Sequence, residues 1–239
     1  MFRQLVLCLG AFVGLAGTAQ AGFVTSLDDV DVWVGTGSNR AAFVVDWKTF
    51  SGTSSFIWGY RWDGAATGED MLRALAASNT GLYANLGDFG SGLGFALFGI
   101  GFDANHNGVF GVSPALTFTN GIASADRDGG LADGRAPTDP GDFYREGWWT
   151  GYWSYWIKPD AASDWGYSDT GMSGRALKDG SWDGWSFAAG FDAGPPSPAS
   201  NPSVVSTPEP SSWILLVIGA GTLIVYARRQ RVIAPAPQV

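Results

Sequence analysis

An apolar run near the C-terminus, followed by a cluster of arginines, limits the folded part of this chain to the residues that precede it. The run extends from Trp213 to Ala227, and the cluster consists of Arg228, Arg229 and Arg231. As a helix the run rises about 22 Å, and two preceding serines and snorkelling arginines bring it to the lower limit of a membrane span. We therefore expect a transmembrane helix over residues 211–227 and a basic cytoplasmic tail over residues 228–239.

The N-terminus has the pattern of a secretory signal peptide. Arg3 supplies the positive charge, Leu5–Leu15 supplies the apolar stretch, and Ala19 and Ala21 are the small residues that flank a cleavage site. We expect cleavage after Ala21, which removes residues 1–21. Cys8 is the only cysteine of the chain, so the mature protein would contain no disulfide and no thiol site.

Pro208, Glu209 and Pro210 stand just before the apolar run, where the prolines keep the peptide extended and accessible. This motif, the apolar run and the arginines together resemble the PEP-CTERM sorting signal of exopolysaccharide-producing Gram-negative bacteria. The resemblance implies that an exosortase-type enzyme recognises residues 208–210. It also implies that the protein is exported, held in the membrane until processing, and then located in the cell envelope or extracellular matrix. An ordinary single-span anchor is the alternative.

A change of composition separates the tail from a single domain. Residues 194–210 are rich in proline and serine and contain no aromatic residue, which predicts an extended linker. Residues 22–193 are long enough for one extracytoplasmic globular domain with a substantial core.

The charge balance argues against nucleic acid as a partner. The chain has 22 acidic and 14 basic residues, for a net charge of −8. Four of the bases lie in the terminal segments, namely Arg3, Arg228, Arg229 and Arg231. The domain therefore has few lysines and arginines with which to bind phosphates.

Most of the domain has the pattern of β-strands. Phe56, Trp58, Tyr60 and Trp62 alternate with smaller or polar residues, as on a strand with one aromatic face. Further strands are expected over residues 31–34, 41–47, 94–102, 148–157 and 182–187. Residues 67–78 instead predict a helix, with Thr67 as its cap. We expect a strand-rich α+β domain, with a mostly antiparallel or mixed sheet and one main helix. A β-sandwich with one helical insertion is the alternative.

Catalytic chemistry has little support in the sequence. His106 is the only histidine, which excludes metal sites built on two or three histidines within one chain. A hydrolase with a carboxylate pair would be compatible with the many acids, but spacing alone does not identify the pair. We therefore expect a non-catalytic protein without an obligatory cofactor.

One short motif suggests a cation site. Asp103, Asn105 and Asn107 place oxygen ligands at alternate positions before Gly108, as in the first half of a calcium loop. Pro114 occupies the position of the closing carboxylate. Ligands from a second acidic loop (Asp126, Asp128 and Asp133) would have to close the site. A tight polar turn is the alternative.

Tryptophans are concentrated in the last third of the domain. Candidates for stacking on a ligand ring are Trp148, Trp153, Trp156, Trp182 and Trp185. Because residues alternate between the faces of a strand, packing in a core explains the same residues.

The same region has a second, looser resemblance. Tyr152–Trp156, Gly171, Leu177–Ser181 and Trp185 are similar to the closing strands of transcobalamin-C-like secreted domains, and Gly68–Ala77 would match the preceding helix. Some members of that family accompany corrinoid or cobalt uptake. The resemblance implies an α+β domain and a small planar ligand.

These observations favour a non-catalytic structural or exopolysaccharide-associated protein of the envelope or matrix. A binding module for a glycan or for a small planar ligand such as a corrinoid is the alternative, and an envelope hydrolase with a carboxylate pair is less favoured.

Overall fold

The computed structural model describes residues 22–49, 54–90, 92–126 and 134–202. The predicted signal peptide, Pro-Glu-Pro motif, transmembrane helix and basic tail lie outside these residues. Within the described part of the chain, no helix is long and apolar enough to cross a membrane.

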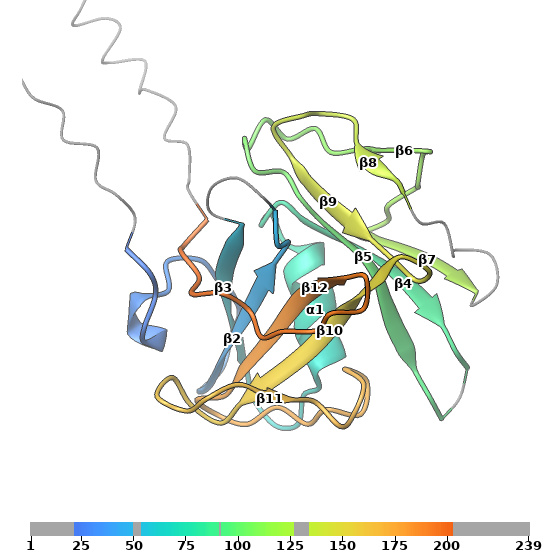
Figure 1. Ribbon diagram of the computed structural model, residues 1–239. Helices are drawn as coiled ribbons and strands as arrows, with labels where there is room; N and C mark the ends of the chain where they lie inside the picture. Colours follow the sequence, from blue (N-terminus) through green and yellow to red (C-terminus); the bar gives the residue numbers. More distant parts are fainter. Residues whose placement is uncertain (1–21, 50–53, 91, 127–133, 203–239) are drawn as a thin grey trace, which may run out of the picture.

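Two mixed β-sheets face each other, and the only α-helix of the described residues packs between them (Figure 1). The first sheet has the order β1 (Trp33–Gly35), β3 (Ser55–Trp62), β2 (Asn39–Asp46), β12 (Trp182–Ala189), β10 (Gly151–Lys158) and β11 (Gly166–Tyr167). The second has the order β7 (Ile122–Asp126), β4 (Leu82–Asp88), β5 (Phe95–Phe102) and β9 (Phe143–Glu146). A small pair joins β6 (Val112–Ser113) to β8 (Ala136–Pro137), and a 3-10 turn, η1, covers Leu27–Asp29. The expected strand-rich fold with mixed sheets and one helix is confirmed.

Both large sheets mix strand directions. In the first sheet β1 pairs with β3, and β2 with β12, in parallel, whereas the remaining pairs are antiparallel. In the second sheet β4 is parallel to β7 and antiparallel to β5. The parallel pairs mean that strands distant in sequence become neighbours, which brings the two ends of the domain together in one sheet.

Alternation along β3 divides its side chains between two cores. Phe56, Trp58 and Trp62 face the helix and the second sheet, where the Trp58 ring meets Phe102 edge to face at 5.3 Å. Ile57 faces the opposite side and packs in a second, smaller core. The predicted aromatic face of this strand is therefore the face that packs against the rest of the domain.

Helix α1 (Gly68–Ala77) forms where the sequence predicts it. The Thr67 hydroxyl accepts a hydrogen bond from the Asp70 N–H (3.1 Å), and the Asp70 carboxylate accepts one from the Thr67 N–H (2.8 Å). This capping box satisfies backbone donors of the first turn. Met71, Leu72 and Leu75 are fully buried on the face between the sheets.

The domain extends further toward the C-terminus than the predicted boundary at residue 193. The Ser200 N–H donates to the Ser55 carbonyl (3.1 Å), and the Ile57 N–H donates to the Ser200 carbonyl (3.1 Å). Ala199 is 5% exposed and belongs to the second core. Proline and serine composition indicates an extended chain here, but the extended chain lies against the first sheet, so residues 195–202 are part of the domain and not of a linker.

Candidate functional site

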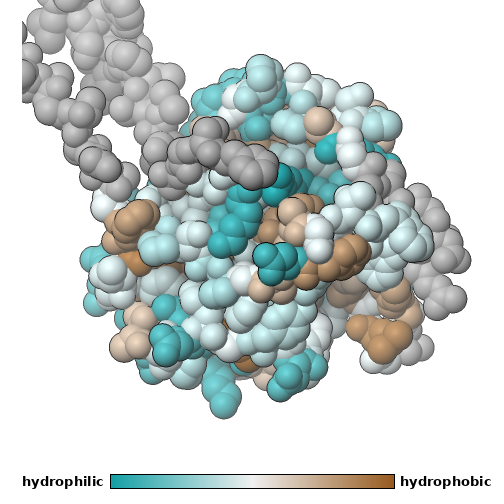
Figure 2. Space-filling view, in the orientation of Figure 1, coloured by the Kyte–Doolittle hydropathy of each residue, from teal (hydrophilic) through white to brown (hydrophobic). Residues whose placement is uncertain are grey.

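An aromatic cavity of about 440 Å³ opens where the end of the β4–β5 hairpin approaches β10 and the segment after β11. Its walls come from four parts of the chain, and its lining residues are Phe89, Leu93, Phe95, Ala96, Leu97, Gly147, Trp148, Tyr152, Trp153, Tyr155, Tyr167, Ser168, Asp169, Thr170, Gly171, Met172 and Trp185. Figure 2 shows apolar surface at the end of this hairpin, at the lower right of the molecule. Leu93, at the turn of the hairpin, is 75% exposed.

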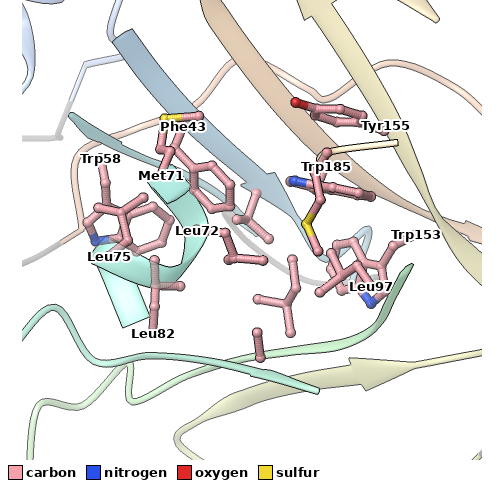
Figure 3. Packing of buried hydrophobic residues seen from close by; sticks show 14 of the residues in the cluster. Phe43, Trp58, Met71, Leu72, Leu75, Leu82, Leu97, Trp153, Tyr155 and Trp185 are labelled. Atoms are coloured by element: carbon pink, nitrogen blue, oxygen red, sulfur yellow. The ribbon is translucent and has the colours of Figure 1, made fainter. Parts of the chain in front are cut away.

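Strands β10 and β12 provide the inner wall of the cavity. The rings of Tyr155 and Trp185 are stacked, with centroids 4.3 Å apart, and both residues are buried. Figure 3 shows the two rings one above the other. Trp153 meets Phe187 edge to face at 5.4 Å, and its Nε1–H donates to the Arg145 carbonyl at 3.1 Å. These contacts hold the rings in place, so this wall is preformed.

Exposed rings form the rim. Trp148 lies in the turn between β9 and β10, 37% exposed, with its ring centroid 5.3 Å from that of Phe98. Tyr167, half exposed, comes from the opposite side, and its hydroxyl is 3.3 Å from the hydroxyl of Tyr152. Burial and the Tyr152 hydroxyl raise the pKa of Tyr167 to about 12. Tyr167 is therefore neutral at physiological pH and presents both a flat ring and a hydrogen-bonding hydroxyl.

Apart from the tyrosine hydroxyls, the hydroxyl and carboxylate side chains that line the cavity come from one segment, the turn after β11. The Ser168 hydroxyl donates to the Thr170 carbonyl at 2.7 Å, which shapes the turn after β11. Asp169 projects from this turn and is exposed. Among the described lining residues it is the only one with a charge. The cavity thus combines apolar walls with a small number of hydrogen-bonding groups, the usual chemistry of small-ligand sites.

A buried ionic network fixes Tyr155 from behind. The Tyr155 hydroxyl donates to Asp183 Oδ2, and Arg175 Nη2 lies 3.3 Å from Asp183 Oδ1. Burial raises the pKa of Asp183, although the hydrogen bond from Tyr155 and the charge of Arg175 partly offset this effect. The network links the inner wall of the cavity to the segment that carries the polar edge, because Arg175 follows that edge in sequence.

The five tryptophans of the predicted stacking set do not form one surface. Trp148, Trp153 and Trp185 line the cavity, whereas Trp156 and Trp182 are not among its lining residues. Trp182 is 3% exposed and packs in the second core, with the Lys158 ammonium 4.4 Å from its ring centroid. The physical reason is strand parity: Trp153 and Trp156, like Trp182 and Trp185, are separated by three residues and point to opposite faces.

Several lining residues have no counterpart in the predicted set. Phe89, Leu93 and Leu97 come from the β4–β5 hairpin, and Tyr152 and Tyr167 from β10 and β11. The hairpin turn is rich in glycine. In a sequence this composition indicates a turn and gives no sign that the flanking residues line a cavity. The alternation of side chains along β10 could have identified Tyr152 as a surface aromatic residue. That the β4–β5 hairpin lies near it is visible only in the folded structure.

The predicted calcium residues occupy a separate site. Asp103, Asn105 and Asn107 lie in the turn that follows β5, at the other end of the strand from the cavity. Of the second acidic loop, Asp128 and Asp133 lie outside the described residues, and Asp126 is the last residue of β7. In the described part of the chain no three His, Cys, Asp or Glu side chains are grouped to hold a metal ion.

Comparison of the chain with protein-family models, with curated proteins and with solved structures found no match. The two resemblances drawn from the sequence remain predictions that rest on the residues that carry them.

Proposed function

We propose that this chain is an exported, exosortase-sorted protein of the cell envelope or extracellular matrix, with a non-catalytic, exopolysaccharide-associated role. In this proposal its folded domain binds a ring-shaped unit of a glycan in the aromatic cavity. The observation that supports a binding role is the cavity itself, whose volume of about 440 Å³ lies within the range of about 300–1,000 Å³ usual for ligand pockets.

The rim has the chemistry that sugar recognition requires. A pyranose ring presents apolar C–H faces that pack on flat aromatic side chains such as Trp148 and Tyr167. Its hydroxyl groups need hydrogen-bond partners, and Asp169, Thr170 and the Tyr167 hydroxyl lie at the same opening. A chain of sugar units can extend beyond the opening into solvent, because the rim residues are exposed.

The distribution of carboxylates favours binding over hydrolysis. Glycoside hydrolysis commonly needs two carboxyl groups on either side of the scissile bond. Asp169 is the single carboxylate among the described lining residues. Asp183 is close to the inner wall, but it is fully buried and bound to Tyr155 and Arg175.

A small planar ligand is a second candidate, and the inner wall favours it. The Tyr155–Trp185 pair and Trp153 form an apolar, aromatic surface behind the rim. Such a surface suits a flat hydrophobic group more than a hydroxyl-rich ring. The two candidates differ in how deep the ligand sits, and variants of the rim and of the inner wall separate them.

The binding test uses the full chain in detergent and calorimetric titration. The probes are neutral and uronic-acid-containing oligosaccharides of four to six units, and a corrinoid as the planar probe. We expect saturable oligosaccharide binding that Trp148→Ala weakens about tenfold, since aromatic stacking contributes about 0.5–1.5 kcal/mol beyond the buried area and about 1.4 kcal/mol is a factor of ten in affinity. Trp149→Ala is the matched control, because Trp149 is the neighbouring tryptophan, is 67% exposed and is not among the lining residues.

Equal losses in the two variants, or no saturable binding of any oligosaccharide, would contradict the glycan proposal. Binding of the corrinoid alone would favour the second candidate.

The sorting proposal has its own test, in a host that contains an exosortase. If the Pro-Glu-Pro motif directs processing, Glu209→Ala should leave the protein in the membrane fraction at its unprocessed mass. Glu209 lies outside the folded domain that ends at residue 202, so the substitution leaves the contacts of the domain unchanged. A change in processing would therefore reflect recognition of the motif and not misfolding of the domain. Processing that is unaltered in Glu209→Ala would favour an ordinary anchor.

A further inference from the structure

The turn after β5 directs several side-chain oxygens toward its own backbone. The two carboxylate oxygens of Asp103 accept hydrogen bonds from the N–H groups of Asn107 (3.1 Å) and Gly108 (2.9 Å). Asn105 Oδ1 accepts from the Asn107 N–H (3.0 Å), and Asn107 Oδ1 accepts from the Val109 N–H (2.7 Å). These bonds also close ordinary polar turns, so they do not by themselves indicate an ion.

The loop between β8 and β9 brings a second set of carboxylates to this turn. Asp139 Oδ2 accepts hydrogen bonds from the side-chain amides of Asn105 (3.0 Å) and Asn107 (2.8 Å). The two loops are more than 30 residues apart in sequence, and Asp139 joins them through its hydrogen bonds with Asn105 and Asn107. Each loop therefore contributes side chains with oxygen atoms to the same place. The sequence motif alone lacks a closing carboxylate, because Pro114 stands where the local pattern requires one.

Asp142, in the same loop, is the observation that points to a ligand. It is only 7% exposed, and neither of its carboxylate oxygens has a hydrogen-bond partner among the described residues. The backbone N–H groups of Ala104 and Asn105 are directed at it without forming a hydrogen bond of good geometry. Asp103 and Asp139 lie close enough for their negative charges to act on Asp142. A buried carboxylate beside two others is costly unless a cation compensates it.

We propose that the turn Asp103–Val109, closed by Asp142, is a calcium-binding site. The donors are the carboxylates of Asp103 and Asp142, the amide oxygens of Asn105 and Asn107, and the Val109 carbonyl at the seventh position of the loop. Asp139 is not a ligand in this proposal: its Oδ2 accepts the side-chain N–H groups of Asn105 and Asn107 and so orients the two amides. Each amide oxygen has a second lone pair beside the one that accepts a backbone N–H.

The donor set selects the kind of ion. No three acidic side chains of the described residues are grouped to hold a metal ion, so the site has two carboxylate ligands, and amide and carbonyl oxygens have to complete the shell. Calcium accepts six to eight oxygen ligands of these kinds in flexible geometry, whereas magnesium requires a tighter octahedron. Zinc prefers nitrogen and sulfur ligands, and the one histidine of the turn, His106, has its ring against Phe102 with centroids 5.5 Å apart and is not among the proposed donors.

Calcium here would connect two long loops of the second sheet. The mature chain contains no cysteine if the signal peptide is removed after Ala21, so no disulfide can provide this connection. A bound ion that bridges Asp103 to Asp142 stabilises the native state by mass action, since the unfolded chain does not hold these residues together. This site is independent of the aromatic cavity and of the function proposed for it.

The test measures calcium binding and thermal unfolding of the full chain in detergent, with calcium chloride, magnesium chloride or chelator as the only variable. We expect one calcium per chain with a Kd of about 0.1–1 mM, as in extracellular calcium modules. At 10 mM calcium the Tm should rise by about 5 °C relative to chelator, with a smaller rise in magnesium.

Asp142→Asn keeps the shape of the side chain and removes its charge. We expect this variant to fold in chelator, with a Tm equal to or above that of the parent, and to bind calcium at least about tenfold more weakly. Asp160→Asn is the matched control, because Asp160 also accepts the N–H groups of a surface turn (Ala162 and Ser163, both 2.9 Å) but lies in another loop. Flat calcium titrations of the parent chain, or identical calcium affinity in the parent and Asp142→Asn, would overturn the proposal.

Discussion

Tyr155 and Trp185 are directly paired residues of neighbouring antiparallel strands, and their rings stack with planes only 12° apart. Cross-strand aromatic pairs of this kind stabilise a sheet, and here the pair also forms the inner wall of the cavity. One contact therefore serves both the core of the domain and the candidate site.

Removal of the Trp185 ring should destabilise the domain strongly. Trp185→Ala deletes a side chain that is 6% exposed, and truncations of buried tryptophan cost about 3–5 kcal/mol. Urea unfolding followed by circular dichroism measures this loss. Trp149→Ala, at an exposed position, should change the free energy of unfolding by no more than about 0.5 kcal/mol. A loss below about 1 kcal/mol in Trp185→Ala would mean that the pair does not support the fold.

The network behind Tyr155 predicts a pH dependence of stability. Folding raises the pKa of Asp183 above its ordinary value of 3.8, so the folded state retains a proton that the unfolded state releases. The contribution of Asp183 to stability is therefore present at low pH and is lost as the pH rises above about 4. Relative to Asp183→Asn, the parent should lose free energy of unfolding as the pH rises above about 4.

The free energy of unfolding is measured with urea at a series of pH values. The quantity compared between the parent and the variants is its slope against pH, not its absolute value. Tyr155→Phe removes a hydrogen bond that lowers the pKa of Asp183, so in this variant the loss should extend to higher pH. Parallel curves for the parent and Asp183→Asn would show that Asp183 releases its proton equally in both states.

The helix cap provides a local test of the fold. Thr67→Ala removes the hydroxyl that accepts the Asp70 N–H, which should cost about 0.5–2 kcal/mol. Thr67→Ser keeps the hydroxyl and should retain most of the stability. Both variants are measured by thermal and urea unfolding, and equal losses in the two would assign the effect to the methyl group of Thr67 and not to the cap.

Sequence patterns predict helix α1 because its signals are local. Thr67, Asp70 and the spacing of Leu72 and Leu75 act within a few residues of one another. Strand β4 lacks such signals, since Asn85 and Gly87 read as turn residues. In the structure Gly87 leaves room for the Phe98 ring, because a Cβ there would lie 2.1 Å from that ring. The glycine belongs to a packing contact between strands, which a single sequence does not reveal.

The candidate site was predictable only where its signals are local in the sequence. The tryptophan-rich segments identify two of its walls, and strand parity separates Trp153 and Trp185 from Trp156 and Trp182. The third wall is the β4–β5 hairpin, and its approach to β10 depends on how the two sheets pack. The closing carboxylate of the calcium proposal, Asp142, and the orienting Asp139 likewise come from a loop that only the fold brings to Asp103.

Close packing at Gly59 makes a further prediction. Gly59 lies on β3 directly opposite Trp33 of β1, and a Cβ at this position would lie 2.4 Å from the Trp33 ring. Gly59→Ala should therefore force Trp33 to move and cost about 1–3 kcal/mol in urea unfolding. Gly194→Ala, where a Cβ meets no atom within 4 Å, is the matched control and should have little effect. Equal behaviour of the two variants would contradict the packing argument.

The C-terminal boundary of the domain can be tested by truncation. A chain that ends after Gly194 loses the segment that donates or accepts hydrogen bonds with Val24, Ser55 and Ile57, and it loses the Ser197 N–H that binds the buried Asp46 carboxylate at 2.8 Å. At about 0.5–1.5 kcal/mol for each hydrogen bond, we expect a loss of about 2–5 kcal/mol. A chain that ends after Pro202 keeps all of these bonds and should unfold at the same urea concentration as the mature protein. If the two truncated chains are equally stable, residues 195–202 belong to the linker after all, since their contacts with the first sheet would then contribute nothing to folding.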